Sequence, residues 1–286
     1  MSYRVGIDIG GTFTDFALLS EDDHRLVIHK QLTTPADPSQ SVLTGLQILI
    51  DKAGVSAADI SAIAHGTTLV TNALIERRGA VTGIVCTAGF SDVFDIARER
   101  RYDMYDLSIT YPAPLAAPHL RREINERVRA DGSIAHSLDE AELRDAVQSM
   151  IDDHGLEALA ICFLNSPANP VHEEQAARLI AREFPDLYVS TSTDIFPFLR
   201  EYERWTTTVM NAFTGPMFDN YLSRLETGLA EMGLTAAFYI MSSSGGTVTL
   251  ETARKYPVRM LESGPAAGVL QSAMLGRQLD QPDLLS

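Results

Sequence analysis

The residue types best suited to chemistry stand together near the start of the chain, in the octapeptide DIGGTFTD at positions 8–15. Asp8 ends an apolar run, and a carboxylate at the end of a strand is a hard oxygen ligand of the kind that Mg²⁺ prefers. The two glycines permit a tight turn whose backbone N–H groups can approach a phosphate, and the two threonines add hydroxyl donors. An ordinary Asp/Gly hairpin turn would explain the glycines but not the whole octapeptide. The predicted phosphate contacts are Gly10, Gly11, Thr12 and Thr14.

A second polar segment, His65–Thr68, lies between an expected strand and an expected helix. The hydroxyls of Thr67 and Thr68, with the N–H groups of the helix N-terminus, could receive an anion or a carbonyl oxygen. Asn72 falls one turn later, on the same helical face as Thr68. Two other interpretations stay open, because Thr67 could cap the helix and His65 could be a hydrogen-bonded core histidine.

Three further segments give weaker signals. Ser242–Gly246 follows an expected strand and could hold polar substrate atoms, but it lacks the Gly-x-Ser-x-Gly elbow of a serine hydrolase. Glu262–Pro265 precedes an expected helix, whose N-terminus could face an anion or be capped and buried. Arg98 opens a charged stretch of a kind that usually forms a solvated helical face.

The amino-acid composition excludes several classes of binding partner. The chain has 286 residues and a net charge of −15, so it has no excess of cations with which to displace phosphate counterions from a nucleic acid. Its longest uncharged apolar run, residues 158–164, is too short to span a bilayer, and no signal peptide is evident. The two cysteines, Cys86 and Cys162, lie in apolar runs and have no zinc-like spacing. We therefore expect a cytoplasmic protein that binds neither nucleic acid nor membrane, with both thiols buried and reduced.

The pattern of apolar residues predicts an α/β fold. Three strand-like segments open the chain, a helix follows, and strands and helices then alternate, which is the order of a ribonuclease-H-like half-domain. Residues 202–213 and 217–232 are expected to form two helices joined at Gly215-Pro216. The opening elements are expected at residues 3–8, 13–19 and 26–29 (strands) and 38–54 (helix).

The octapeptide resembles the first phosphate loop of the actin- and hexokinase-like ATPases. Along nearly its whole length the chain also resembles hydantoinase A proteins, a family that includes ATP-dependent N-methylhydantoinases, 5-oxoprolinases and subunits of acetone and acetophenone carboxylases. Besides the octapeptide, the matching blocks are His65–Gly79, Ala88–Asp92, Arg98 with Tyr105–Leu107, Glu126-Arg127 with Asp131-Gly132, Met241–Gly246 and Glu262–Gly268.

This resemblance implies a fold, a reaction and a set of site residues. The fold would be a ribonuclease-H-like (actin-like ATPase) half-domain with a mixed sheet and flanking helices at residues 1–195, followed by the start of a hydantoinase A domain at residues 196–286. The reaction would use ATP and Mg²⁺ to phosphorylate the carbonyl oxygen of a cyclic amide, which water then hydrolyses. A subunit of an ATP-dependent ketone carboxylase is the alternative. The implied residues are Asp8 for Mg²⁺ and catalysis, Thr67 and Thr68 for catalysis, and Asn72, Arg98, Ser244 and Gly245 for the substrate.

The resemblance also implies partners and a missing part. Relatives continue with a second Asp-x-Gly-Gly-Thr loop and a site for the nucleotide base, whereas this chain stops at Asp283–Ser286, inside the strand expected to lead to that loop. A truncated half that only binds or assembles is therefore a third interpretation, and activity of the chain alone stays open. A hydantoinase B-type partner subunit and a homo- or hetero-oligomer are expected.

Overall fold

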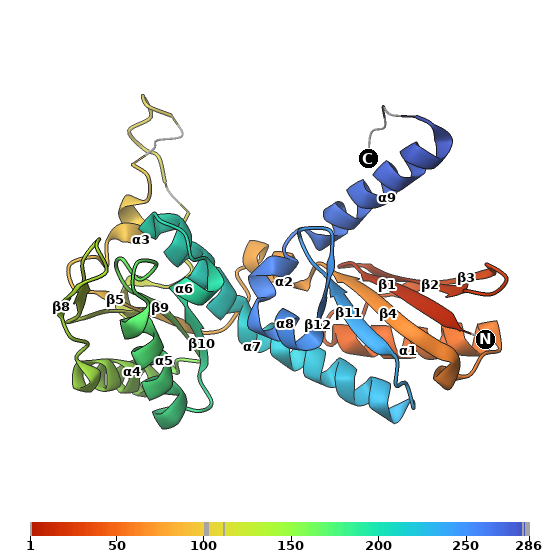
Figure 1. The fold of residues 1–286 in the computed structure, drawn as a ribbon, viewed down its shortest axis with the longest axis horizontal. Coiled ribbons are helices and arrows are strands. Elements are labelled where there is room, and N and C mark those ends of the chain that lie inside the picture. The colour runs from red at the N-terminus through yellow and green to blue at the C-terminus, as the bar shows by residue number, and fades with distance from the viewer. Residues whose placement is uncertain (1, 100–102, 111, 282, 284–286) are drawn as a thin grey trace. The chain divides into compact units, whose positions relative to one another are not determined.

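The computed structural model describes residues 2–99, 103–110, 112–281 and 283, and it consists of two compact units (Figure 1). The first unit comprises Met1–Arg78 and Met217–Ser286, and the second comprises Gly79–Pro216. The second unit is therefore inserted into the first. This division by contacts does not test the sequence boundary predicted between residues 195 and 196, which stays a prediction. The strand expected at the end of the chain falls largely outside the described residues.

A six-stranded mixed sheet forms the centre of the first unit. Its strands are β1 (Tyr3–Ile9), β2 (Phe13–Ser20), β3 (Leu26–Leu32), β4 (Ile60–Thr67), β11 (Ala237–Met241) and β12 (Thr247–Thr249). They lie in the order β12-β11-β4-β1-β2-β3. β1, β4 and β11 are parallel neighbours, whereas β2, β3 and β12 are antiparallel to the strands they pair with. The predicted α/β class with a mixed sheet is confirmed.

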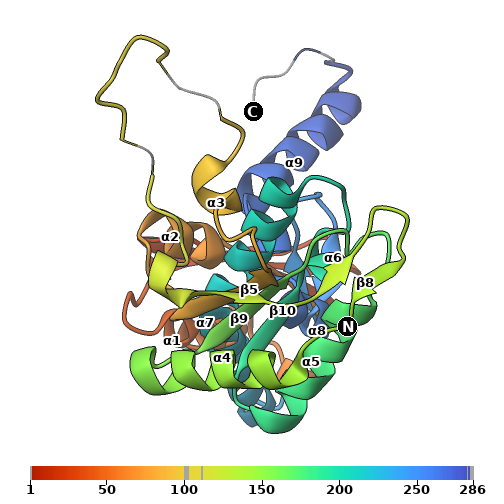
Figure 2. The ribbon, with the colours of Figure 1, turned by 90° about the vertical axis from the view of Figure 1, so that its left-hand side faces the viewer.

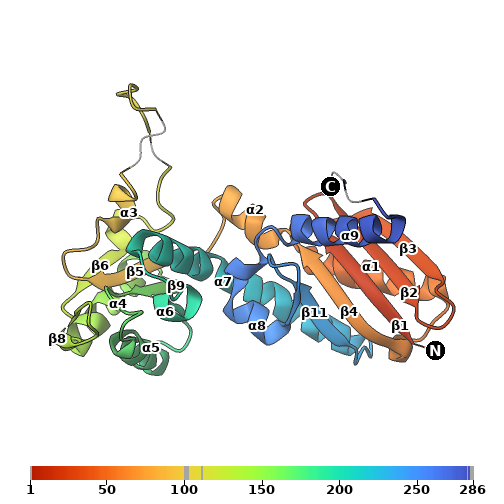
Figure 3. The same cartoon turned by 45° about the horizontal axis from the view of Figure 1, so that its top comes forward.

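Helices cover this sheet unequally. They are α1 (Pro38–Ala53), α2 (Leu69–Ile75), the second half of α7 (Glu201–Glu231), α8 (Leu250–Lys255), α9 (Ser263–Leu279) and the 3₁₀ helices η1 (Ala57–Asp59) and η3 (Pro257–Met260). Val5, Ile7 and Ile9 of β1 face a core that also holds buried residues of α1 and α7. Among the described helices, α9 alone crosses the strands on the opposite face (Figure 3). Asp8 borders a cavity on that face.

Residues at its two ends explain where α1, which packs on this sheet, begins and ends. The side chain of Asp37 caps its N-terminus by accepting a hydrogen bond from the Ser39 N–H, and Pro38 occupies the first helical position. Gly54 ends the helix at φ 68°, a conformation that a glycine adopts without strain. Gly45 lies so close to Phe16 of β2 that there is no room for a side chain between helix and sheet.

The second unit contains a four-stranded parallel sheet in the order β10-β9-β5-β6. Helices α4 and α5 lie together on one face of it (Figure 2). Its strands are β5 (Thr82–Thr87), β6 (Arg121–Ile124), β9 (Ala158–Cys162) and β10 (Tyr188–Thr191), with a separate hairpin of β7 (Arg127–Val128) and β8 (Ile134–His136). Its helices are α3 (Val93–Ile96), α4 (Glu140–His154), α5 (Val171–Glu183), α6 (Ser192–Ile195), the first half of α7 and the 3₁₀ helix η2 (Pro118–Leu120).

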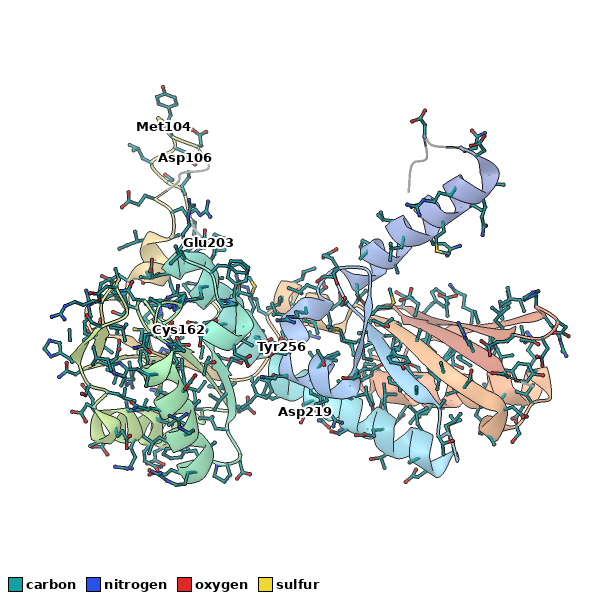
Figure 4. The ribbon with its side chains drawn as sticks, in the orientation of Figure 1. Met104, Asp106, Cys162, Glu203, Asp219 and Tyr256 are labelled. Carbon is teal, nitrogen blue, oxygen red and sulfur yellow. The ribbon has the colours of Figure 1, made fainter. Side chains whose placement is uncertain are left out.

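The other face of this parallel sheet packs against the first half of α7. Trp205 is fully buried there, in one cluster with Cys86 and Cys162 (Figure 4 labels Cys162). Both thiols are free, as the sequence predicted, and burial raises the pKa of Cys86 to about 12. The two thiols are therefore protonated core side chains at neutral pH.

The second unit also encloses a buried ionic network. Glu173 of α5 has no exposed surface, and its carboxylate accepts hydrogen bonds from the backbone of Phe163 and from Ser192 and Thr193. Arg204 of α7 donates to the same Ser192 hydroxyl at 3.0 Å. Burial raises the pKa of Glu173, and the hydrogen bonds that its carboxylate accepts oppose this shift.

The prediction of two helices around Gly215-Pro216 is wrong, because α7 is one helix of 31 residues with Pro216 inside it. Pro216 removes one helical hydrogen bond, but packing continues on both sides of it. A side chain on Gly215 would collide with the ring of Tyr188, and Phe218 and Leu222 are fully buried in the core of the first unit. Tertiary packing therefore outweighs the local signal for a helix break. Within the described residues, every helix is too short or too polar to cross a lipid bilayer.

Candidate functional site

The candidate site lies at one edge of the first unit's sheet. Because β1, β4 and β11 are parallel neighbours, their carboxyl ends meet at the same edge, and each is followed by a segment singled out in the sequence. α9 also starts at this edge, since the hydroxyl of Ser263 donates to the Thr67 carbonyl at 3.0 Å. The segments are Gly10–Thr12 after β1, Thr67-Thr68 at the end of β4, and Ser242–Gly246 after β11.

The glycine turn is held in place by its own backbone. The Gly10 N–H donates to the Phe13 carbonyl at 2.9 Å, and the Gly10 carbonyl accepts a hydrogen bond from the Thr33 hydroxyl at 2.9 Å. No described residue accepts a hydrogen bond from the N–H of Gly11 or of Thr12. Two adjacent backbone donors thus remain available to an anion, as the sequence predicted for a phosphate turn.

Thr14 does not join these donors. Its side chain is fully buried, and its hydroxyl lies 2.9 Å from the hydroxyl of Thr33 and 3.3 Å from that of Ser41. These contacts tie β2 to the start of α1. Phosphate binding by Thr14 therefore has no support from its surroundings and stays a prediction.

Asp8 belongs to a row of residues that crosses the open face of the sheet. In the strand register Asp8 pairs with Asp15, Asp15 with Lys30, and Asp8 on its other side with Gly66. Lys30 Nζ lies 2.9 Å from both carboxylate oxygens of Asp15, whereas no described residue forms an ion pair or hydrogen bond with the Asp8 carboxylate. Partial burial and then the charge of Asp15 raise the pKa of Asp8, and Lys30 opposes this shift.

This row forms the floor of a cavity of about 910 Å³ between the open face of the sheet and α9. Small residues, including Gly66 of β4 and Gly264 and Gly268 of α9, line it and leave it wide. A Cβ atom added to Gly66 would lie 3.0 Å from Asp8 Oδ1, so the glycine gives the carboxylate its room. The cavity is large enough for a small-molecule ligand.

The surroundings of Asp8 fit a cation. An unpaired carboxylate whose pKa is raised by partial burial and by a second carboxylate is a group that a bound cation would stabilise. Within the described ranges, no three or more His, Cys, Asp or Glu side chains gather as a metal-binding cluster. A cation at Asp8 would therefore take most of its ligands from water and from a phosphate, which is usual for Mg²⁺.

Thr67, Thr68 and Asn72 lie directly beside the glycine turn. Thr67 is buried, and its hydroxyl accepts a hydrogen bond from the N–H of Leu69, the first residue of α2. The N-cap residue of α2 is Thr68, whose side chain makes no capping hydrogen bond. The Thr68 hydroxyl donates to the Ile9 carbonyl at 3.4 Å and accepts from Asn72 Nδ2 at 3.2 Å. A Cβ atom on Gly11 would lie 3.8 Å from the same Nδ2 atom. The start of α2 and the glycine turn thus form one polar surface.

His65 is a core histidine, one of the two interpretations that the sequence left open. It is fully buried, and its Nε2 lies 2.6 Å from the hydroxyl of Tyr221 of α7. Burial lowers the pKa of His65 to about 4, so the ring is neutral at pH 7. No sequence signal pointed to Tyr221, because 156 positions separate the two residues.

The remaining predicted residues do not belong to the glycine turn or to the start of α2. Ser244 and Gly245 are in the turn between β11 and β12, where the hydroxyls of Ser242 and Ser244 are 2.8 Å apart and Gly245 adopts a φ of 83°. Arg98 belongs to the second unit and forms an ion pair with Glu203 at the start of α7 (Figure 4 labels Glu203). Substrate binding by Ser244, Gly245 and Arg98 stays a prediction.

Sequence comparisons extend the resemblance over the whole chain. Residues 4–184 match the family model of the hydantoinase/oxoprolinase N-terminal region, and residues 204–286 match that of hydantoinase/oxoprolinase. An uncharacterised protein of Methanocaldococcus jannaschii is 37% identical over 98% of this chain and 41% of its own length. The alpha subunit of caprolactamase from Pseudomonas jessenii is 36% identical over 93% of this chain and 39% of its own length.

Two solved structures share the fold. The crystal structure of ATP-dependent caprolactamase from Pseudomonas jessenii superposes with a TM-score of 0.86 at 33% identity, covering 96% of this chain and 40% of that one. Nucleotide-free acetone carboxylase superposes with a TM-score of 0.85 at 26% identity, covering 97% of this chain and 41% of that one. The chain thus spans about two fifths of the length of these relatives. Together with the family models, these matches show that the chain belongs to the hydantoinase/oxoprolinase family.

Proposed function

We propose that this chain is the phosphate-binding part of an ATP-dependent cyclic-amide hydrolase. One observation carries the proposal: Asp8, the free N–H groups of Gly11 and Thr12, and Asn72 surround a single turn at the carboxyl edge of the sheet. Membership of the family and the similarity to a caprolactamase described as ATP-dependent support ATP as the phosphate donor and a cyclic amide as the acceptor.

The chemical need for ATP follows from the stability of an amide. Resonance makes the carbonyl carbon a poor target for water. Transfer of the γ-phosphoryl group forms a bond from the amide oxygen to phosphorus and breaks the bond to ADP. Water then attacks the activated carbon, the ring C–N bond opens, and a second water releases phosphate from the acyl group.

The residues of this chain would act by position and charge. Asp8 would anchor Mg²⁺ beside the transferred phosphate, and the N–H groups of Gly11 and Thr12 would neutralise its oxygens. Mg²⁺, when bound, would neutralise the negative charge that builds on the leaving ADP. A hydantoinase B-type partner would complete the enzyme, since relatives of this chain are named as subunits of caprolactamase and of acetone carboxylase.

The proposal predicts a Mg²⁺-dependent stabilisation of the protein by ATP. Ligand that binds only the folded state raises its stability by RT ln(1 + [L]/Kd). We expect MgATP to raise the melting temperature by a few degrees, and Asp8→Asn to abolish the shift or to weaken ATP at least about tenfold. Scanning fluorimetry over an ATP series, with Mg²⁺ and with EDTA, measures this effect.

A matched variant controls for the loss of one negative charge. Asp22→Asn changes an exposed aspartate in the turn between β2 and β3, at the opposite end of the same strands. It should leave the MgATP shift intact. An equal response of wild type and Asp8→Asn to MgATP would contradict the assignment of the loop.

A ketone carboxylase subunit remains the second candidate, because acetone carboxylase shares the fold at a nearly equal TM-score. Both candidates phosphorylate a carbonyl oxygen, so nucleotide binding does not separate them. Phosphate release measured with a lactam and, separately, with a ketone and bicarbonate, in the presence of the partner proteins, separates the two candidates. Release with the lactam indicates the hydrolase, and release with the ketone indicates the carboxylase. A chain that binds nucleotide but never turns over would be a binding or assembly half.

A further inference from the structure

A second carboxylate, that of Asp15, lies beside Asp8 on the open face of the first unit's sheet. The two residues are direct partners in the register of β1 and β2, and both line the cavity of about 910 Å³. Directly opposite residues of an antiparallel pair have Cβ atoms about 4.5–5.5 Å apart. Two carboxylates at this spacing can ligate one divalent cation together. The role of Asp15 is therefore decided by what else holds its oxygen atoms.

The ammonium group of Lys30 holds both of these oxygen atoms. Its Nζ lies 2.9 Å from each carboxylate oxygen of Asp15 and 4.8 Å from the ring centroid of Phe13. Asp15 and Phe13 both belong to β2, and the Phe13 carbonyl accepts the hydrogen bond that closes the glycine turn. An ion pair and a cation–π contact thus fix the ammonium group beside the turn. Because no described residue pairs with Asp8, its carboxylate stays free.

Folding stability alone does not explain this ion pair. The side chains of Lys30 and Asp15 are 55% and 52% exposed, and ion pairs exposed to this degree contribute little to stability. Their effect on the local charge is larger. Asp8 and Asp15 would together carry two negative charges, whereas the row of Asp8, Asp15 and Lys30 carries one. A free divalent cation is therefore attracted less strongly, and it must also compete with the ammonium group for Asp15.

We propose that Lys30 is a positioning residue that makes cation binding depend on the nucleotide, an inference that rests on the proposed function. With Asp15 occupied, Asp8 is the one free carboxylate of this row, and a single carboxylate retains Mg²⁺ weakly because the ion gives up its water reluctantly. Phosphate oxygens would supply the missing ligands and charge. Mg²⁺ would therefore bind together with ATP, and the cavity would stay clear of free cations until then.

Binding of Mn²⁺ to the whole chain without nucleotide tests this role. Mn²⁺ takes the same oxygen ligands as Mg²⁺, and the electron paramagnetic resonance signal of the free ion measures how much is bound. We expect Lys30→Met to bind Mn²⁺ at least about tenfold more tightly than the wild type, because Asp15 then joins Asp8 as a second ligand. A gain of affinity also excludes misfolding of the variant as its cause.

Two control variants separate the pairing with Asp15 from the charge of the cavity in general. Lys52→Met removes a cation that lines the same cavity but bonds the Ile28 carbonyl, and it should change the Mn²⁺ affinity less than about threefold. Lys30→Arg keeps a cation that can pair with both oxygens of Asp15, and it should bind Mn²⁺ as the wild type does.

A double variant tests whether Asp15 is the second ligand. Asp15→Asn in the Lys30→Met background removes the second carboxylate, so the gain in Mn²⁺ affinity should disappear. Equal Mn²⁺ binding by the wild type and Lys30→Met would overturn the proposal. A gain that persists in the double variant, or an equal gain in Lys52→Met, would overturn it as well.

The MgATP melting shift, measured on the same samples, reports on the proposed function separately. A normal shift of the wild type without tighter Mn²⁺ binding by Lys30→Met refutes only the role of Lys30. Tighter Mn²⁺ binding by Lys30→Met without any shift of the wild type refutes only the ATP assignment.

Discussion

At the scale of single residues, the candidate site is defined by polar groups that lack partners inside the protein. The Asp8 carboxylate forms no ion pair or hydrogen bond with a described residue, because Lys30 pairs with Asp15 instead. The N–H groups of Gly11 and Thr12 have no acceptor among the described residues. By contrast, Thr14 has both of its contacts inside the fold. The unpaired groups are exposed to solvent, so a ligand can replace the water that pairs with them, and their position at one edge of the sheet marks a candidate binding site.

His65 shows the opposite case, a polar side chain taken fully into the core, and it makes stability depend on pH. Its pKa is about 4 in the folded chain, against the ordinary histidine value of 6.5, so the unfolded chain binds the proton first as the pH falls. The contribution is complete above pH 6.5 and is lost as the pH approaches 4. Between pH 7 and 5 we expect a loss of about 2 kcal/mol from this residue.

Urea unfolding of the wild type and of His65→Gln at both pH values measures this loss. Glutamine can still bond the Tyr221 hydroxyl, but it does not titrate. The variant should therefore lose about 2 kcal/mol less than the wild type between pH 7 and 5. Equal losses in the two proteins would show that His65 is not the titrating group.

At the scale of elements, the position of α1 on the sheet depends on one glycine. A Cβ atom on Gly45 would lie 2.2 Å from Cζ of the buried Phe16 and 3.1 Å from Cδ of Gln31. We expect Gly45→Ala to destabilise the first unit by about 1–3 kcal/mol, because overpacking moves helix and strand apart. Chemical denaturation of the first unit measures the change.

Gly268 of α9 provides the matched substitution, since no heavy atom lies within 4 Å of its added Cβ atom. Gly268→Ala should be neutral or should stabilise α9 by up to about 1 kcal/mol through helix propensity alone. If both alanine variants changed the free energy of unfolding equally, close packing of α1 on β2 would not explain why position 45 is a glycine.

The sequence predicted those elements whose signals are local. Asp37, Pro38 and Gly54 mark both ends of α1, and the contiguous octapeptide marks the turn between β1 and β2, whose phosphate binding stays a prediction. The continuity of α7 through Pro216 was not predictable, because it depends on packing by residues far apart in the sequence. The same holds for contacts that need the strand register. The pairing of Lys30 with Asp15 beside Asp8, and of Tyr221 with His65, follows only once strands and helices are placed.

At the scale of the whole molecule, the two units have separate cores, so they should unfold separately. The single tryptophan, Trp205, is fully buried in the second unit, and its fluorescence reports on that unit. Glu173→Ala removes the buried acceptor of hydrogen bonds from Phe163, Ser192 and Thr193, which we expect to cost about 3 kcal/mol or more. The variant should lower the fluorescence midpoint in urea.

Hydrogen exchange of peptides from β1–β4, measured in the same urea series, reports on the first unit. The urea midpoint of their exchange should be unchanged in Glu173→Ala and should fall in Gly45→Ala. The fluorescence midpoint should be unchanged in Gly45→Ala. Two signals that always move together would mean that α7, which continues through both units, unfolds them as one.

The insertion of one unit into the other sets an order of events during translation. The second unit is continuous from Gly79 to Pro216, so a nascent chain can complete it as soon as that stretch has left the ribosome. The opening strands emerge earlier, yet β11, the partner that β4 needs on its free side, is synthesised only after the whole inserted unit. Until then β4 presents an unpaired edge that other polypeptides can join. A pause in synthesis before Ala237 would therefore favour aggregation of the first unit, which carries the phosphate turn. The second unit would by then be folded.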